Sequence, residues 1–348
     1  MEFAFYVHHH GSGHLMRCLA IASALKNCHI TFLGSGLEAQ KSLIPNSIDL
    51  IFLPMDTPNE QDHDFLDQSL EGLHYAPLNV SGQLQRVNII TSFLASHPKL
   101  LFVVDVSVEI AMLSGLCGVP AIVIRQHGLR DDLPHQICYH NAVGLLAPFD
   151  VRMAGQVPAW INEKTFYTGG LSRFATSADQ SDPNKRQVAV LIGSGGTSID
   201  HEFLNHLSGQ CPGWTFHVVG NSENSNPVHN LHFHGRWNDP RPILADCCIV
   251  IGNAGHNTVM ECASLNKRFI AIAEERPFKE QEEKARIIGA LSLAVHLSAA
   301  EILHVNWKEI LENLLTSRPN WTGFIRSDAA ERAADYLINT HRSIFKHD

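Results

Sequence analysis

The sequence predicts an α/β protein of two domains, each built around a parallel β-sheet. The chain has 348 residues, which is long for one domain and fits two. Short apolar runs alternate with segments of helical periodicity in both halves of the chain. A polar segment at 177–186, SADQSDPNKR, separates the halves. We therefore expect domains at 1–176 and 187–325, a linker at 177–186 and a C-terminal helix within 326–348.

Buried strands in the first half are predicted by apolar runs at 3–7, 29–33, 50–53, 101–104, 121–124 and 144–147. Helical spacing lies between several of them, at 15–26, 80–95 and 108–116. Buried strands separated by helices are typical of a parallel sheet covered on both faces. The polar stretch 56–79 contains two prolines and interrupts the alternation. We interpret it as a long functional or mobile loop.

The same alternation resumes after the linker. Apolar runs predict strands at 188–192, 215–219, 231–233, 248–251, 268–272 and 294–296. Helical patterns fit 200–207, 241–245, 258–264, 279–289, 307–315 and, last, about 328–340. The second half thus repeats the architecture of the first without sequence repetition. Ligands of such sheets bind beyond the carboxyl ends of the strands, so the loops at those ends are the candidate sites.

Composition excludes several classes of protein. The net charge is −9 and long basic runs are absent, which argues against nucleic-acid binding. The eight cysteines form no C-x-x-C pair, so we interpret them as reduced core residues rather than a zinc site or a disulfide framework. No apolar stretch reaches 18 residues, and the first residues lack the basic region of a signal peptide. We expect a cytoplasmic protein.

The first chemical motif is HGSGHLMR at 10–17, directly after the first predicted strand and opening a helix. Its glycines, Gly11 and Gly13, allow a sharp turn and a close approach of ligand to the backbone. His14 lies at the mouth of the helix, where it can take a proton from a bound hydroxyl. The alternative is a structural turn with a capping histidine. His8, His9 and His10 are expected on the strand with alternating directions, which argues against one shared metal.

Asp105 ends the predicted strand LFVVD at the carboxyl edge of the first sheet. A carboxylate there can orient His14 and raise its basicity, as in a base–orienter pair. The alternative is that Asp105 caps the helix that follows.

Two glycine-rich turns follow strands of the second domain. In GSGGT at 193–197, the amides, including those of Gly195 and Gly196, and the hydroxyls of Ser194 and Thr197 suit a phosphate. In GNAGHNTVME at 252–261, a turn of small residues opens a helix on which Thr258 and Glu261 share one face. A diphosphate on the turn and a ribose on the carboxylate would match the two polar ends of a nucleotide. The alternative for Glu261 is interaction with its own helix dipole.

A further motif, RPFKEQ at 276–281, opens the next helix. Glu280 and Gln281 place a carboxylate beside a carboxamide, which suits sugar hydroxyls. The alternative is an ordinary helix start with a proline and acidic residues in the first turn.

Together these motifs resemble the glycosyltransferases of the GT-B fold, two Rossmann-like domains with parallel sheets facing across a cleft. The likeness is greatest to family 28, which includes the N-acetylglucosaminyltransferase that completes lipid II. It spans nearly the whole chain and is strongest from 235 to 281. The resemblance implies that the G-x-G-H loop with His14 faces the acceptor and the reaction centre. It assigns the nucleotide-sugar contacts to Gly11, Gly13, Gly195, Gly196, Arg236, Trp237, Ala254, Gly255, His256, Thr258, Glu261, Glu280 and Gln281.

In these assignments Glu261 binds the ribose and the 254–256 turn binds the diphosphate. Backbone groups of the segment around Arg236 and Trp237 read the uracil, and Glu280 with Gln281 contacts the donor sugar. The chain departs from the family pattern at His256, where Ser or Gly is usual, and at Glu280, where Asp or Gln is common. The string G-x-G-H-x-x-R-C at 11–18 also resembles a UDP-sugar hydrolase of pseudaminic acid synthesis. The acceptor is therefore left open as a sugar, a lipid-linked group or water.

The resemblance implies an inverting hexosyl or N-acetylhexosaminyl transfer from a UDP-sugar, in cell-envelope glycan synthesis, with no cofactor and no metal. The Asp62-x-Asp64 string lies in the polar loop without a strand before it, so we do not interpret it as a metal site. A nucleotide-sugar hydrolase, an epimerase and a non-catalytic sugar-nucleotide sensor remain the alternatives. Peripheral contact with the inner face of the membrane is expected only for a polyprenyl-linked acceptor.

Overall fold

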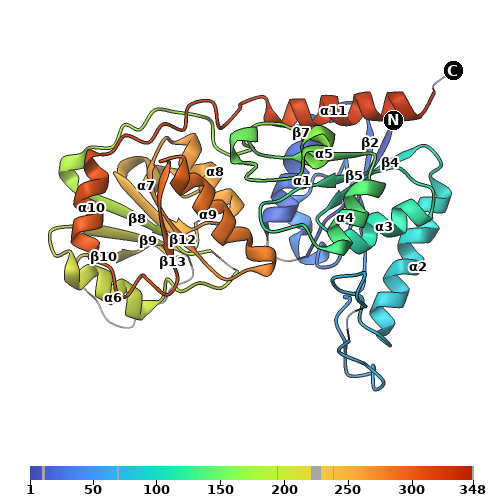
Figure 1. The fold of residues 1–348 in the computed structure, drawn as a ribbon, viewed down its shortest axis with the longest axis horizontal. Helices are drawn as coiled ribbons and strands as arrows, with labels where there is room; N and C mark the ends of the chain where they lie inside the picture. Colours follow the sequence, from blue (N-terminus) through green and yellow to red (C-terminus); the bar gives the residue numbers. More distant parts are fainter. Residues whose placement is uncertain (10–11, 69, 194, 221–228, 238, 347–348) are drawn as a thin grey trace.

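The N-terminal and C-terminal halves form two separate lobes in the computed structural model (Figure 1). The model describes residues 1–9, 12–68, 70–193, 195–220, 229–237 and 239–346. Each lobe has one sheet in which all pairs of neighbouring strands are parallel, with helices on both faces. The predicted α/β architecture of two parallel-sheet domains is confirmed.

The N-terminal domain contains a seven-stranded sheet in the order β3-β2-β1-β4-β5-β6-β7. Its strands are β1 (Glu2–Tyr6), β2 (His29–Gly34), β3 (Asp49–Phe52), β4 (Leu100–Asp105), β5 (Ala121–Ile124), β6 (Gly144–Ala147) and β7 (Thr165–Tyr167). Its helices are α1 (Ser12–Ala24), α2 (Ser81–Ser96), α3 (Val108–Leu116), α4 (Leu133–Asn141) and α5 (Ala159–Lys164). Buried side chains alternate along the central strands, so the sheet has an apolar cluster on each face.

The C-terminal domain contains a six-stranded sheet in the order β10-β9-β8-β11-β12-β13. Its strands are β8 (Gln187–Leu191), β9 (Thr215–Val219), β10 (Leu231–Phe233), β11 (Ile249–Asn253), β12 (Arg268–Ala273) and β13 (Ala294–Ser298). Its helices are α6 (His201–Gln210), α7 (Arg241–Asp246), α8 (His256–Ser264), α9 (Glu280–Ala290) and α10 (Trp307–Thr316). This strand order is that of a dinucleotide-binding fold, in which the connection reverses direction between the first and fourth strands.

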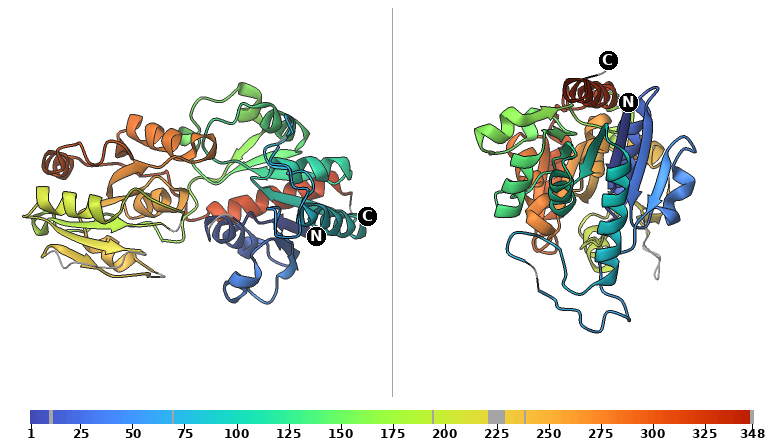
Figure 2. Two further views of the ribbon diagram at one scale, coloured as in Figure 1. Left: turned by 90° about the horizontal axis from the view of Figure 1, so that it is seen from below. Right: turned by 90° about the vertical axis from the view of Figure 1, so that its right-hand side faces the viewer.

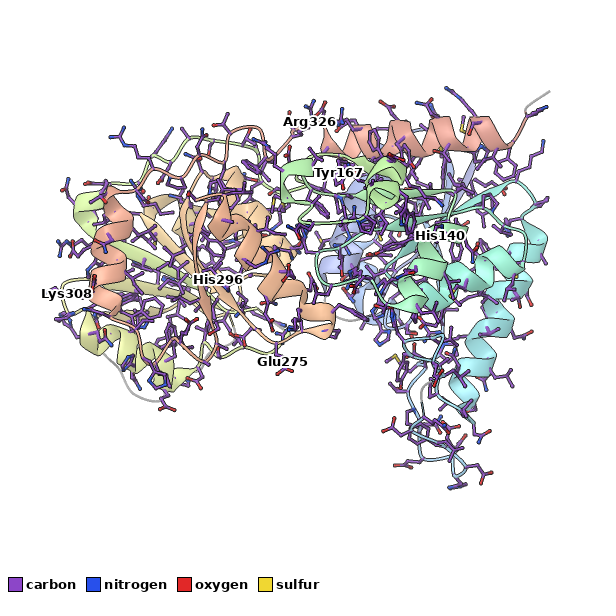
Figure 3. The ribbon with its side chains drawn as sticks, viewed as in Figure 1. His140, Tyr167, Glu275, His296, Lys308 and Arg326 are labelled. Carbon is purple, nitrogen blue, oxygen red and sulfur yellow. The ribbon has the colours of Figure 1, made fainter. Side chains whose placement is uncertain are left out.

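The chain crosses between the domains twice. One crossing follows Tyr167 and the other leads through Arg326, both labelled in Figure 3. The two crossings are joined where the Gly170 amide donates to the Phe324 carbonyl, at 2.7 Å. After the second crossing, α11 (Ala329–Ile344) runs along the N-terminal domain (Figure 1) and packs against α1. Its Leu337 is buried in the N-terminal core, so the end of the chain completes the first domain.

The predicted long loop at 56–79 projects from the N-terminal domain beside α2 (Figures 1 and 2). Among its described residues the only strand-like pairing is an isolated bridge between Leu66 and Leu78. Glu109 on α3 attaches the loop to the domain, because its Oε1 accepts hydrogen bonds from the amides of His74 and Tyr75 at 2.7 and 3.0 Å. The loop is therefore anchored near its end.

Two described α-helices and one strand were missing from the sequence prediction: α4, α5 and β7. The helix α4, LPHQICYHN, has a proline near its start and histidine, glutamine or asparagine at four of its positions, so its apolar spacing is irregular. The strand β7 is three residues long and lies at the sheet edge. Elements this short carry little periodicity, and tertiary packing decides their conformation.

Candidate active site

The strand order brings the first motif and Asp105 together. β1 and β4 are neighbours at the centre of the N-terminal sheet, with Tyr6 opposite Val104. α1 begins shortly after β1, and Asp105 is the last residue of β4. The chain reverses its direction of progress across the sheet between these two strands, and ligands of such sheets bind at that point.

His14, Arg17 and Asp105 form a hydrogen-bonded group there. His14 Nδ1 lies 3.0 Å from Asp105 Oδ2. Arg17 Nη2 donates to Asp105 Oδ1 and Oδ2 at 2.7 and 2.9 Å, and also lies 3.0 Å from His14 Nδ1. Because the Asp105 carboxylate already accepts from Arg17, His14 Nδ1 is not needed as an acceptor for the guanidinium. The arrangement that fits these distances has His14 protonated at Nδ1 and donating to Asp105. His14 Nε2 then has a free lone pair for a proton.

Asp105 is fully buried and remains a carboxylate. Burial raises the pKa of Asp105, but Arg17 and His14 lower it by more, so the net pKa lies well below its usual range. The alternative that Asp105 caps the next helix is wrong, because Ser107 is the N-cap residue of α3 and accepts from the Ile110 amide. The contact expected between Asp105 and His14 is present; the catalytic roles of both residues remain predictions.

The histidines before the first motif do not continue the strand, contrary to the sequence prediction. β1 ends at Tyr6, and the rings of His8 and His9 stack with centroids 4.9 Å apart. The His8 ring lies 5.3 Å from that of His14, so it contributes to the same region. His10 and Gly11 lie outside the described residues, so the assignment of Gly11 stays a prediction.

The C-terminal sheet has its reversal between β8 and β11, with Leu191 opposite Gly252. Glu274, the residue directly after β12, holds the turns that follow β8 and β11. Its Oε1 accepts from the Ser198 amide at 2.6 Å, from the Thr197 hydroxyl at 3.1 Å and from Asn253 Nδ2 at 2.8 Å. The Thr197 hydroxyl also accepts from the Ile199 amide at 3.0 Å, so both of its hydrogen-bonding roles are filled within the protein, which corrects the expectation that it binds phosphate. Ser194 lies outside the described residues, so its assignment stays a prediction.

The glycine turn at 195–196 is held by Arg276. Its Nη2 donates to the carbonyls of Gly195 and Gly196, at 2.7 and 2.5 Å. Gly196 has a φ of +83°, a conformation that glycine adopts without strain. The carbonyls of this turn therefore face Arg276.

α8 begins with an open N-terminus. Gly255 is its N-cap, and no described side chain caps the helix. The unbonded amides of the first turn and the helix dipole make this end suitable for an anion. Ala254 is fully buried and its amide donates to the Ile272 carbonyl, so the diphosphate assignment is wrong for the Ala254 amide. The backbone amides that can still bind a diphosphate are those of Gly255, His256 and the next residues of the first helical turn.

His256 adds a neutral imidazole at this end. Its Nε2 is buried without a hydrogen-bond partner among the described residues. Burial lowers the pKa of His256 well below its usual value, and the nearby cations Lys284 and Arg17 lower it further. A buried ring nitrogen without a partner is costly unless a ligand satisfies it.

The N-terminal ends of α1 and α8 meet at the junction between the domains. A Cβ atom placed on Gly13 would lie 3.5 Å from Asn257 Nδ2. A side chain larger than hydrogen at position 13 would therefore contact α8. Two helix N-termini and the group formed by His14, Arg17 and Asp105 are thus close together.

Glu261 is buried, with a side-chain exposure of 9%. Burial raises its pKa, and an ion pair with Arg173, 2.7 Å from Nε to Oε1, partly offsets this. Arg173 lies on the first crossing between the domains. A ribose at Glu261 would share the carboxylate with Arg173. Thr258 lies one turn earlier, and a Cβ atom placed on Gly252 of β11 would be 3.1 Å from its methyl group.

Arg236 and Trp237 follow β10 and are exposed, Trp237 by 47%. The Gly220 amide donates to the Gly235 carbonyl at 2.9 Å, which fixes this segment against the end of β9. The segment therefore lies at the same carboxyl edge as the glycine turns.

Glu280 and Gln281 have different surroundings. Gln281 Oε1 accepts from the Glu274 amide at 3.2 Å, so this side chain shapes the turn before α9. Glu280 Oε1 accepts from Lys284 Nζ at 2.9 Å. Burial raises the pKa of Glu280, whereas Lys284 lowers it more, to about 2. Lys284 is fully buried and was missed by sequence analysis; its only signal was its position four residues after Glu280.

Phe278 docks the C-terminal domain onto the N-terminal one. Its carbonyl accepts from the Leu129 amide at 2.7 Å. Its ring centroid lies 4.6 Å from that of His74 and 4.8 Å from that of His135, and the Arg130 guanidinium lies 5.0 Å away. Phe278 has a φ of +58°, which is strained for a large side chain. The segment that holds it leaves the C-terminal sheet near Glu275, labelled in Figure 3.

Among the described residues, one group of side chains is spaced closely enough to hold a metal: His74, Asp132 and His135. Arg130 Nη1 lies 2.9 Å from His135 Nε2 and places a positive charge beside this group. Asp62, from the Asp62-x-Asp64 string of the polar loop, is not part of this group. Its carboxylate accepts hydrogen bonds from the amides of Asn59 and Ser81, each at 2.9 Å.

Comparison with known proteins identifies the second domain. Residues 181–336 match the model of the glycosyltransferase family 28 C-terminal domain. The second half of the chain therefore carries the sequence pattern of the family 28 C-terminal domain. No curated protein sequence matches the chain.

Solved structures show the same fold over the whole chain. The MurG of Acinetobacter baumannii is 13% identical over 97% of this chain and 100% of its own, with a TM-score of 0.67. A UDP-glucosyltransferase from Polygonum tinctorium is 14% identical, with 98% of each chain covered and a TM-score of 0.67. A spinosyn rhamnosyltransferase complexed with thymidine diphosphate is 13% identical over 97% of this chain and 96% of its own, with a TM-score of 0.63.

These findings confirm the predicted GT-B fold and the predicted enzyme class, a glycosyltransferase with a family 28 domain. No described helix is both long and apolar enough to cross a lipid bilayer.

Proposed function

We propose that the protein transfers a hexose or N-acetylhexosamine from a UDP-sugar to an acceptor hydroxyl, with inversion at the anomeric carbon and without a metal ion. The observation that carries this proposal is the meeting of the α1 and α8 N-termini beside His14 and Asp105. One side of that junction suits a diphosphate, and the other supplies a base.

In the proposed mechanism, the α8 N-terminus binds the diphosphate and Glu261 binds the ribose. His14 Nε2 takes the proton of the acceptor hydroxyl while Asp105 holds the ring through Nδ1. The acceptor oxygen attacks the anomeric carbon from the face opposite the leaving UDP, which inverts the configuration. Helix amides and the buried cations Arg17 and Lys284 stabilise the departing charge in the place of a metal.

The first test is calorimetric titration of the protein with UDP, TDP and GDP in the presence of EDTA. We expect UDP to bind more tightly than the other two, with unchanged affinity when Mg²⁺ replaces EDTA. The TDP arm matters because the spinosyn rhamnosyltransferase of similar fold is complexed with thymidine diphosphate. Failure of all three nucleotides to bind folded protein would reject the proposed donor site.

Glu261→Ala tests the ribose assignment. We expect UDP affinity to fall by about 1.5–3 kcal/mol, the value of hydrogen bonds to a charged group. Glu301→Ala is the control, because Glu301 is an exposed glutamate of the same domain whose partner is Ser298. Equal UDP affinity of the two variants would remove Glu261 from the site.

A UDP-sugar hydrolase is the second candidate, because the same base can activate water. Release of free sugar from UDP-sugar at a rate that no acceptor increases would favour it, and conversion to another UDP-sugar would favour an epimerase. Nucleotide binding with neither reaction would favour a sensor. The anomeric configuration of a transfer product, measured by NMR, tests inversion. We place the reaction in the cytoplasm, at the inner membrane face if the acceptor is lipid-linked.

A further inference from the structure

Glu274 is a buried carboxylate in the C-terminal domain to which the family resemblance assigns no role. It directly follows β12, and its Oε1 accepts from the Ser198 amide at 2.6 Å and from the Ser198 hydroxyl at 2.8 Å. The same oxygen accepts from Asn253 Nδ2 at 2.8 Å and from the Thr197 hydroxyl at 3.1 Å. Because Ser198 lies in the turn after β8 and Asn253 is the last residue of β11, one carboxylate oxygen joins the ends of three strands.

The peptide groups of the glycine turn after β8 are oriented by Arg276, whose guanidinium donates to the carbonyls of Gly195 and Gly196. In a trans peptide group the C=O and N–H bonds point in opposite directions. The Gly195 carbonyl shares its peptide group with the Gly196 amide, and the Gly196 carbonyl shares its own with the Thr197 amide. The N–H groups of Gly196 and Thr197 are therefore directed away from Arg276.

These two amides are open to a ligand. Neither donates a hydrogen bond to a described residue, whereas the next amide, that of Ser198, is occupied by Glu274. Gly195 and Gly196 are exposed, and a Cβ atom placed on Gly196 would meet nothing within 4 Å. Successive backbone N–H groups that face open space bind anions such as phosphate. The turn therefore presents a free pair of donors at 196 and 197.

The same carboxylate also fixes the approach to α8. Asn253, which donates to Glu274, lies two residues before Gly255, the N-cap of α8. The open N-terminus of α8 is a second place in this domain where backbone amides can bind an anion. Glu274 thus sets the position of the glycine turn relative to α8. Fixing two binding elements before the ligand arrives raises affinity, because less conformational freedom is lost on binding.

We propose that Glu274 is a positioning residue for the diphosphate of the nucleotide-sugar. It holds the glycine turn and α8 at the spacing at which the Gly196 and Thr197 amides and the first turn of α8 bind the two phosphates together. Glu274 acts through Ser198 and Asn253 and does not itself contact the ligand. The inference rests on the proposed function for the identity of the nucleotide.

The charge of Glu274 makes the proposal sharply testable. A carboxylate repels a nearby diphosphate, so loss of its charge would tighten UDP binding if repulsion were its main effect. If Glu274 mainly positions the turn and α8, loss of its charge weakens UDP binding, because hydrogen bonds to a neutral acceptor are weaker. The two effects have opposite signs, so one substitution decides between them.

Glu274→Gln and Glu275→Gln are a matched pair, because Glu275 is the next residue and is exposed (Figure 3). UDP is titrated by calorimetry and uridine, which has no phosphate, by saturation-transfer NMR. We expect Glu274→Gln to weaken UDP binding about tenfold and to leave uridine binding unchanged, and Glu275→Gln to change neither. Glu261→Ala should weaken both ligands. UDP affinity of Glu274→Gln equal to or above that of Glu275→Gln would overturn the proposal, as would equal losses of UDP and uridine affinity.

Inorganic pyrophosphate separates this inference from the proposed function. In ¹H–¹⁵N spectra of the unsubstituted protein, the amide signals of Gly196 and Thr197 should move with pyrophosphate and with UDP but not with uridine. Unmoved signals in a protein that binds UDP would overturn the inference without any variant. Pyrophosphate binding that depends on Glu274, without UDP binding, would keep the positioning role and reject the UDP-sugar function. UDP binding that does not depend on Glu274 would reject the positioning role and keep the proposed function, and binding of neither anion would reject both.

Discussion

Replacement of Asp105 by asparagine tests the centre of the candidate site. The change keeps the shape of the side chain but removes its charge. Asp105 is fully buried and faces Arg17, whose side chain is 3% exposed. The substitution therefore leaves a buried guanidinium without its counter-ion and gives His14 Nδ1 an amide neighbour in place of a carboxylate.

The magnitude follows from these contacts. Breaking a buried ion pair costs about 3–5 kcal/mol. The carboxamide oxygen of the substituted side chain would still accept one hydrogen bond from Arg17, so we expect the lower end, about 3 kcal/mol. That is a large part of a typical domain stability of about 5–15 kcal/mol. An amide N–H directed at Nδ1 also favours the tautomer that is protonated at Nε2, which cannot accept a proton. We expect turnover to fall by about 10²–10⁴.

Urea unfolding and single-turnover transfer measure the two effects. Asp49→Asn is the matched control, because Asp49 pairs with His29 at 2.8 Å on the surface and is 67% exposed. It should change stability by less than about 1 kcal/mol and leave turnover unchanged. Adding Arg17→Met to Asp105→Asn removes the unpaired charge, so it should recover stability without recovering turnover. If Asp105→Asn has the same free energy of unfolding and the same turnover rate as the control Asp49→Asn, the reasoning is refuted.

Three more predictions follow from the site. His14→Ala should lose about 10²–10⁴ in turnover with UDP affinity unchanged, measured beside the surface control His29→Ala; retained turnover would exclude His14 as the base. Phe278→Ala should loosen the junction of the domains, lowering kcat/KM about tenfold and raising the radius of gyration in X-ray scattering, whereas the exposed Phe52→Ala should do neither. Stability should fall by about 2–3 kcal/mol between pH 6.5 and pH 5.5, measured by urea unfolding. Burial lowers the pKa of His135 to about 4 and those of His127 and His256 well below their usual value, so the unfolded chain takes up protons that the folded protein does not. His256→Gln should reduce the slope, and a flat profile would show that these rings are not buried neutral.

The sequence predicted the elements whose pattern is local and strong. The helix at 108–116 and the strands at 121–124, 144–147, 215–219 and 231–233 have the predicted bounds. The helix and the first three of these strands are rich in apolar residues and have glycine or proline close by, so the local pattern indicates their conformation. The position of Asp105 at a strand end was also predicted from local sequence, because it follows the apolar run LFVV. Its contact with His14 was inferred because the carboxyl ends of parallel strands lie at the same edge of a sheet.

The rest of the site depends on contacts far apart in the sequence. Glu274 follows a strand and has no motif around it, yet its carboxylate joins two glycine turns through Ser198 and Asn253. Arg173 pairs with Glu261 across 88 residues, and the amide of Ala254 is used by a neighbouring strand. A pattern of residue types indicates which groups suit a ligand. It does not show which of those groups the protein has already satisfied internally.

The docking of Phe278 shows how the two domains can act as one site. An ordinary helix start was one of two interpretations of the sequence around it, and the observed φ of +58° is unfavourable for phenylalanine by itself. The conformation persists because the N-terminal domain supplies the Leu129 amide and the ring contacts with His74 and His135. The same segment leads directly into α9, which holds Glu280 and Lys284. Separation of the domains would release the strain in Phe278 and move the start of α9 away from the N-terminal domain. The docking of the domains and the position of Glu280 and Lys284 are therefore coupled through one short segment.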